Sequence, residues 1–222
     1  MNESKFKHTA ITTAIMVLFT MVGTALLAFT YFSTKTPIEA SEAEARLTLL
    51  NEVLPPSLHD NNLLKDTVEI AAGGLLGNTS KTLAYRARLS EKPAAVVLEA
   101  IAPDGYSGEI KLLIAIRHDG SLAGVRVLAH RETPGLGDYI DIAHSDWIKH
   151  FDNQSLAKTQ DGKALENEAQ DEYWKVKKDG GNFDYMAGAT ITPRAVVKAV
   201  HQTLQYFQAH QNELFAAAGE QK

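Results

Sequence analysis

The sequence predicts an α+β protein, with an N-terminal single transmembrane helix followed by a twisted antiparallel sheet packed with helices. Three observations lead to this class. Residues 9–34 contain no charged side chain, residues 67–130 are rich in strand patterns, and residues 193–217 repeat apolar positions at helical spacing. A chain of 222 residues has room for one ordinary domain beside a membrane segment.

Residues 9–34 form the expected transmembrane helix. At about 1.5 Å per residue, an uncharged run of this length crosses a hydrocarbon core of ~30 Å. The alternatives are a buried helix, which usually shows a polar edge, and a cleaved signal peptide, which needs a clear cleavage site. Ala25 to Ala28 offers only a weak version of such a site. We therefore expect an uncleaved membrane anchor.

The flanking charges set the expected orientation of this single-pass helix. Lys5 and Lys7 precede the span, whereas Lys35 and Arg46 after it are mixed with acidic residues. By the positive-inside rule, residues 1–8 are expected in the cytoplasm and the remaining domain on the opposite side of the membrane.

Residues 35–66 are expected to lead from the membrane to the domain. Pro37 is predicted to end the membrane helix. Residues 38–53 then show apolar positions among acids, as an amphipathic helix does. A pair of prolines at 55 and 56 is predicted to break that helix.

The C-terminal domain, residues 67–222, is expected to begin with a sheet. Its predicted strands are 67–72, 82–89, 94–102, 109–117 and 122–130. The last two flank Asp119 and Gly120, a pair favoured in tight turns, and should form a hairpin.

Helical and irregular segments are expected after the sheet. Residues 139–151 read as a helix, 152–170 as a polar loop, 172–176 as a strand and 178–181 as a turn. Residues 193–217 read as a long helix whose sheet-facing side chains are Val196, Val200, Leu204, Phe207 and Leu214.

The composition narrows the chemistry of the chain. There is no cysteine, which excludes disulfides, thiolate catalysis and cysteine-ligated iron–sulfur clusters within this chain. The net charge is −5 and no basic stripe is present, so no nucleic-acid partner is expected. The histidines are dispersed, and His144 and His150 lack the spacing of a helical metal pair. No metal site is expected.

The segment 184–193 holds the best candidate site. It places the hydroxyl of Thr190 two residues before an expected N-cap at Thr192, which proline follows. The backbone N–H groups and dipole of the following helix favour a phosphate there. Gly188 and Ala189 leave space for a large planar group. From these residues alone, a plain helix start is the commoner explanation.

The same segment resembles the flavinylation motif of the periplasmic FMN-binding domain family, Asp-x-x-Ser/Thr-Gly-Ala-Thr/Ser. Asp184, Gly188, Ala189 and Thr190 match this motif, and Ala187 stands where the family has Ser or Thr. The resemblance implies that FMN is joined through its phosphate to the hydroxyl of Thr190. It also implies that a flavin transferase installs FMN from FAD, with Asp184 orienting the turn or being recognised by the transferase.

Two earlier segments extend the resemblance. Residues 105–108, Gly-Tyr-Ser-Gly, are similar to the family's entry into its central sheet, and residues 132–137 are similar to its Glu-Thr-Pro-Gly-Leu-Gly loop beside the flavin. The helix end at Thr192 would help to hold the phosphate. The implied flavin walls are Tyr106, Glu132, Thr133, Gly135, Leu136 and Gly137. Without the resemblance, residues 132–137 read as a plain strand-to-helix connection.

With its N-terminal span, the whole chain resembles the RnfG family, the G subunits of Rnf (Rsx) ion-translocating electron transport complexes. The C subunit of the sodium-translocating NADH:quinone reductase is a related protein. The resemblance implies an electron carrier with covalent FMN, without a complete active site of its own. Its implied partners are other membrane and iron–sulfur or flavin subunits of the complex.

Two other functions remain open at this point. The first is an unflavinylated periplasmic structural or assembly subunit, for which Ala187 is the best support. The second is a flavin reductase acting alone, against which the membrane anchor and the missing nicotinamide fingerprint argue.

Overall fold

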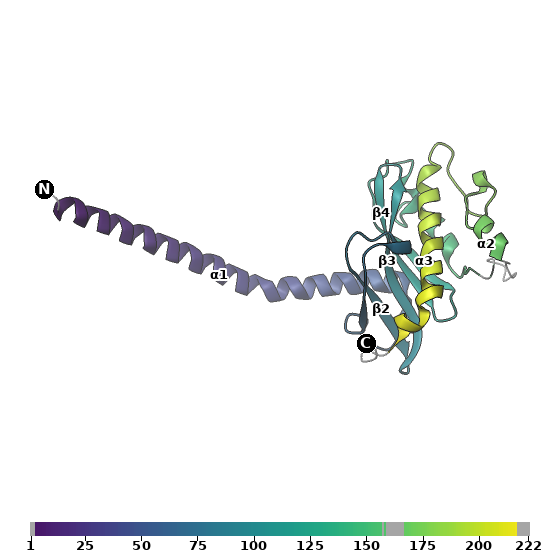
Figure 1. Cartoon of the computed structure of the whole chain (residues 1–222), viewed down its shortest axis with the longest axis horizontal. Helices are drawn as coiled ribbons and strands as arrows, with labels where there is room; N and C mark the ends of the chain where they lie inside the picture. The colour runs from purple at the N-terminus through teal and green to yellow at the C-terminus, as the bar shows by residue number, and fades with distance from the viewer. Residues whose placement is uncertain (1–2, 157, 159–166, 217–222) are drawn as a thin grey trace. The chain divides into compact units, whose positions relative to one another are not determined.

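The computed structural model of the chain describes residues 3–156, 158 and 167–216. The chain divides into two compact units, Met1–Arg46 and Leu47–Lys222. The first unit is most of helix α1, which spans Glu3–Val53 and which Figure 1 draws as one continuous ribbon. The second unit holds the sheet and the remaining helices.

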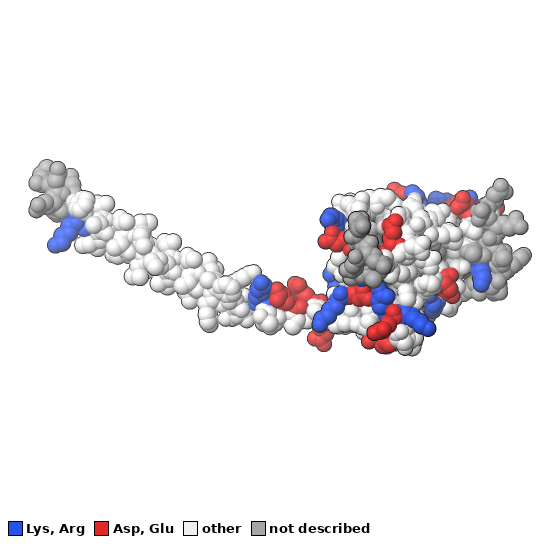
Figure 2. All heavy atoms as spheres, turned by 60° about the horizontal axis from the view of Figure 1, so that its bottom comes forward, with Lys and Arg blue, Asp and Glu red and all other residues white. Residues whose placement is uncertain are grey.

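Among the described residues, α1 is the one helix long and apolar enough to cross a membrane, by length and composition. Figure 2 shows its long uncharged stretch in white, bounded by charged side chains. The side chains of Phe19 and Leu27 are each 75% exposed, which is not the packing of a core helix.

The predicted end of the membrane helix at Pro37 is wrong, because α1 continues through this residue. Proline removes one backbone N–H from the helix and usually bends or breaks it. Here good helix formers, including Glu39, Glu42 and Ala45, follow the proline and continue the ladder of hydrogen bonds. The expected membrane and amphipathic helices are therefore one helix, which ends at Val53 before the two prolines, as predicted.

The second unit is built on a five-stranded antiparallel sheet with the order β1-β2-β3-β4-β5. Its strands are β1 Thr67–Ile70, β2 Thr82–Leu89, β3 Lys92–Gly105, β4 Gly108–Arg117 and β5 Leu122–Ala129. All the strands predicted for this sheet are confirmed. In the turn between β4 and β5, the backbone N–H of Ser121 donates to the Asp119 carboxylate at 2.9 Å, and Gly120 has a φ of +83°.

Side chains alternate between the two faces of the sheet along each strand. Each face is covered by a separate group of apolar residues. One face packs against helix α3, Ile191–Phe215, which lies along the sheet in Figure 1. The α3 residues in this core include all the predicted ones, Val196, Val200, Leu204, Phe207 and Leu214, together with Ala195, Val197 and Ala199. On the other face, Tyr85 and Val97 pack with Leu50 and Val53 at the end of α1 and with Leu54 directly after it.

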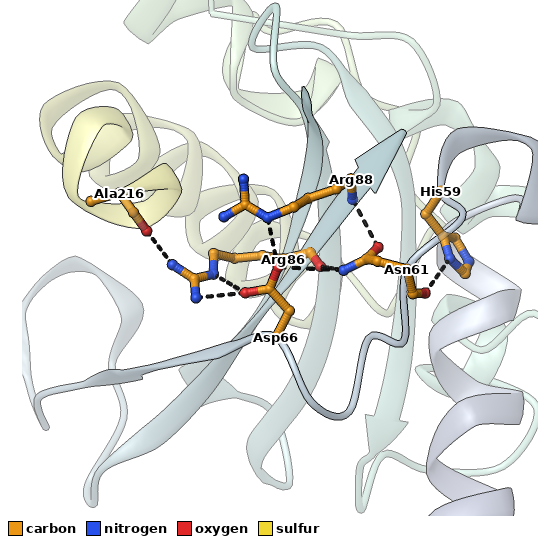
Figure 3. Close-up of polar contacts among 6 residues, drawn as sticks. All are labelled: His59, Asn61, Asp66, Arg86, Arg88 and Ala216. Atoms are coloured by element: carbon orange, nitrogen blue, oxygen red, sulfur yellow. Dashed lines mark hydrogen bonds and ion pairs between the residues drawn. The ribbon is translucent and has the colours of Figure 1, made fainter. Parts of the chain in front are cut away.

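A buried polar network ties β2 to two distant segments (Figure 3). Arg86 is only 2% exposed, and its Nε donates to Asp66 at 2.5 Å, while its Nη1 donates to the carbonyl of Ala216 after α3. The other Asp66 oxygen accepts from Arg88 Nε at 2.7 Å, and Asn61 Nδ2 donates to the Arg86 carbonyl at 2.9 Å. One carboxylate thereby pairs with two arginines.

The predicted helix at 139–151 is wrong. Two short 3-10 helices, η3 Asp138–Ile140 and η4 Asp146–Phe151, replace it. The Asp141 carboxylate accepts the N–H of Ala143 at 2.9 Å, and Ser145 Oγ accepts that of Trp147 at 3.0 Å. Such local side-chain bonds compete with the helical ladder. The buried side chains of this segment are Tyr139, Ile140, Trp147, Ile148 and Phe151.

The predicted strand at 172–176 is also wrong, because helix α2, Asn167–Tyr173, covers its start and Val176 makes only an isolated bridge. The turn predicted at 178–181 overlaps η5, Lys177–Asp179, and Gly180 in the left-handed region ends it. Short 3-10 turns also occur at η1 Pro56–Leu58 and η2 Gly74–Leu76. Of the loop predicted at 152–170, residues 157 and 159–166 lie outside the described residues, and its last part is α2.

Candidate functional site

Thr190 lies immediately before helix α3, as its N-cap residue, and its side chain makes no capping hydrogen bond. The residue is 9% exposed. The Thr190 hydroxyl therefore does not cap the helix. It lies at the N-terminal end of α3, where the helix dipole favours an anion. The backbone N–H groups of a first helical turn also lack intrahelical acceptors.

The prediction that Thr192 is the N-cap is wrong, because Thr192 lies inside the first turn of α3. It is 1% exposed, and its hydroxyl donates to Glu132 Oε2 at 2.5 Å. The helix begins earlier than predicted because Thr190 already has helical φ and ψ of −77° and −27°. Pro193 still falls in the first turn, where its missing N–H costs nothing.

A cavity of about 360 Å³ lies beside Thr190, within the size range of ligand pockets. Segments from the β3–β4 turn, from the loop after β5 and from the start of α3 contribute to it. Its lining residues are Tyr106, Glu132, Thr133, Leu136, Gly137, Gly188, Ala189, Thr190, Ile191 and Thr192. The structure therefore brings together residues of all the segments that the sequence singled out.

Glu132 connects the segments around the cavity. The residue is 5% exposed, and Oε1 accepts the backbone N–H of Ser107 at 3.1 Å while Oε2 accepts the Thr192 hydroxyl. Both oxygens therefore have donors, as a buried carboxylate requires. Sequence reasoning missed this connection, because the partners lie 25 and 60 residues away along the chain.

The loop at 132–137 needs a small residue where it meets α3. A Cβ on Gly137 would lie 2.8 Å from Glu132 Oε2 and 2.9 Å from Thr192 Oγ1, which is closer than atoms normally approach. Because glycine has no Cβ, the loop at this position can lie directly against the Glu132 carboxylate and against Thr192 of α3.

Apolar side chains form the open walls of the cavity. Tyr106 is 67% exposed, Leu136 47% and Ile191 45%. Exposed apolar surface beside a cavity is typical of sites that bind an apolar group. Ile191 was missed by the sequence analysis, and its place directly after Thr190 was the only available signal.

Two predicted site residues, Gly135 and Asp184, do not line the cavity. Gly135 has a φ of +75°, which favours glycine, and its N–H donates to Asp138 Oδ1 at 2.9 Å. Asp184 pairs with Lys177 at 2.5 Å, and both side chains are 54% exposed. These residues shape the loop and the turn on either side of the cavity.

The turn before Thr190 is held by aromatic side chains beneath it. Trp147 is a core residue, and its Nε1 donates to the Asp184 carbonyl at 2.8 Å. The Tyr139 hydroxyl accepts the N–H of Met186 at 3.2 Å, and burial raises the pKa of Tyr139. Ala187, at the tip of this turn, is exposed.

Within the described ranges, no group of three His, Asp or Glu residues is placed to hold a metal ion.

Comparisons with known proteins match both parts of the chain. Residues 1–53 match the family model of the RnfG N-terminal region, and residues 105–205 match that of the FMN-binding domain. The second match includes every residue that lines the cavity.

Similar proteins, each named as the G subunit of an ion-translocating oxidoreductase complex, extend over nearly the whole chain. The one from Pseudoalteromonas atlantica is 44% identical over 206 residues, 93% of this chain and 91% of that protein. One from Pseudomonas aeruginosa is 47% identical over 202 residues, 91% of this chain and 90% of that protein. One from Vibrio cholerae is 46% identical over 201 residues, 90% of each chain.

Proposed function

This chain belongs to the RnfG family, the G subunits of ion-translocating oxidoreductase complexes, and from that premise we propose that it carries electrons through FMN attached covalently to Thr190. The observation that carries the proposal is the free Thr190 hydroxyl beside the cavity, inside the segment that matches the FMN-binding domain. The bond would be a phosphoester between the FMN phosphate and Thr190 Oγ1.

The residues of the cavity fit such a group. The start of α3 offers backbone N–H groups and the positive end of a helix dipole to a phosphate. The exposed apolar surfaces of Tyr106, Leu136 and Ile191 suit a flat ring system. Gly188 has open space at its Cβ position, so the backbone beside Thr190 is accessible.

Attachment requires a flavin transferase and FAD as co-substrate. The hydroxyl oxygen of Thr190 bonds to the phosphorus of the FMN half, the anhydride bond of FAD breaks, and AMP leaves. The hydroxyl proton passes to a base of the transferase. Because Thr192 donates its hydroxyl to Glu132, Thr190 is the hydroxyl at the start of α3 that is available for this step.

When bound, FMN supplies one- and two-electron transfer. The chain's residues hold it in place, since a phosphoester prevents its loss from a domain that faces the periplasm. On this proposal Thr190 is an attachment point and takes no part in each electron-transfer event.

The proposal places the protein in the bacterial inner membrane. Helix α1 is the anchor, with residues 1–8 in the cytoplasm and the FMN-binding domain in the periplasm. The uncharged stretch of α1 and the lysines before it support this topology. The partners are the other membrane and iron–sulfur or flavin subunits of the complex, together with the flavin transferase.

One observation favours a second function, that of an unflavinylated structural or assembly subunit. Ala187 is exposed at the tip of the turn before Thr190, where the flavinylation motif has a hydroxyl side chain. On this alternative the transferase does not modify the chain.

Flavin fluorescence in a denaturing gel tests the proposal. Wild type, Thr190→Ser and Thr190→Ala are expressed with and without an active flavin transferase. We expect a fluorescent band for wild type and Thr190→Ser only with the transferase, and none for Thr190→Ala. A dark wild-type band beside a transferase that labels another substrate would favour the structural subunit instead.

A further inference from the structure

Glu132 is the only charged side chain among the described residues that line the cavity beside Thr190. The other lining residues are uncharged, so no Lys, Arg or His among them offsets its charge. The nearby Arg131 is exposed, and the ring of His130 accepts the backbone N–H of Glu132 through Nδ1 at 3.1 Å without lining the cavity.

The carboxylate of Glu132 is shielded from water, because the residue is 5% exposed. Its two oxygens accept from the Ser107 N–H and the Thr192 hydroxyl, so each oxygen has a donor. Water and salt screen a charge much less in such a place than at the surface.

From this arrangement we propose that Glu132 lowers the reduction potential of the flavin that the cavity holds. The inference rests on the proposed function. Electrons that enter the flavin add negative charge near a fixed carboxylate, and charge beside the ring is one of the ways in which a protein tunes a cofactor. Uptake of protons by the reduced flavin offsets part of this repulsion. Glu132 itself neither gives nor takes an electron.

The same contacts make Glu132 a positioning residue. Through Thr192 and Ser107 it joins the start of α3 to the β3–β4 turn. If the role of Glu132 were purely structural, its replacement would change stability and flavin loading. Removing only the charge would then not shift the reduction potential of the flavin in the positive direction.

Spectroelectrochemical titration of the flavinylated, detergent-solubilised full chain tests the proposal. Dithionite supplies the electrons, and solvent supplies the protons. Glu132→Gln keeps the side-chain shape and removes the charge, and Glu132→Ala is a second neutral variant. The control is Asp104→Asn, because this carboxylate pairs with Lys198 at 2.7 Å and is 61% exposed.

We expect a more positive midpoint potential in the neutral variants than in wild type, and no change in Asp104→Asn. An unchanged or more negative potential in a loaded neutral variant would overturn the proposal. Glu132→Asp keeps the charge, and a potential in Glu132→Asp as positive as in the neutral variants would also overturn the proposal. A wild-type chain without flavin would instead defeat the proposed function.

Discussion

At the residue scale, two threonines near the start of α3 differ in what their hydroxyls do. Thr192 is buried and donates to Glu132, whereas the Thr190 side chain makes no capping bond and faces the cavity. Because of this difference, the proposed phosphoester is assigned to Thr190, and Glu132 is the charged side chain beside it.

Gly137 is predicted to be sensitive to one added methyl group. Its φ of −90° suits alanine, but the new Cβ would press on Glu132 and Thr192. We expect Gly137→Ala to lower the free energy of unfolding by roughly 1–3 kcal/mol, the usual cost of overpacking. Chemical denaturation of the full chain in detergent measures this loss.

Gly188→Ala is the matched comparison for this prediction. Gly188 has open space at its Cβ position but a φ of +89°, so alanine there meets backbone strain alone, about 1–2 kcal/mol. A Gly137→Ala protein as stable as wild type would contradict this close approach of the loop at 132–137 to Thr192 of α3.

Sequence reasoning found most of the cavity residues but not their contacts. Thr190, Gly188 and Ala189 stand out because they are adjacent in a motif. The bond between Glu132 and Thr192 spans 60 residues, and no local pattern indicates it. For this reason the sequence also placed the N-cap at Thr192, which by its residue type is a good N-cap.

At the element scale, the strands were predictable and the segment after the sheet was not. The strands carry alternating or continuous apolar patterns with a clear turn between β4 and β5, which are local signals. Residues 139–151 carry apolar side chains at spacings that suit one helix or two short turns. The side chains of Asp141 and Ser145, which bond to nearby backbone N–H groups, produce the two turns.

The network around Arg86 gives a prediction for the sheet and the end of α3. Asp66→Ala would leave the Arg86 guanidinium, with a side chain 3% exposed, without its carboxylate. Removing one partner of a buried ion pair costs about 3 kcal/mol, and we expect a loss of that size in the free energy of unfolding. Urea denaturation followed by circular dichroism measures it.

The control for this prediction is Glu69→Ala, on the neighbouring strand β1. Glu69 pairs with Lys81 at 3.0 Å, but their side chains are 67% and 74% exposed. An exposed pair contributes about 0–1 kcal/mol. Equal losses for the two variants would contradict a structural role for the Arg86 network.

At the scale of the whole molecule, the proposed function requires an anchored protein whose domain lies outside the inner membrane. The chain has no cysteine, so a single introduced cysteine reports on one position. We expect an impermeant maleimide to label Ala209→Cys in intact spheroplasts and to label Ser4→Cys only after the cells are broken. Labelling of Ser4→Cys alone in intact spheroplasts would reverse the topology.

The most direct test of the central claim is the intact mass of the denatured full chain, expressed with an active flavin transferase, beside Thr190→Ala. The account predicts the added mass of one FMN phosphoester in wild type, mapped to the peptide that contains Thr190, and the unmodified mass in the variant. An unmodified wild type, with the transferase shown to be active on another substrate, would contradict covalent flavinylation. Added mass in Thr190→Ala would contradict the assignment to Thr190.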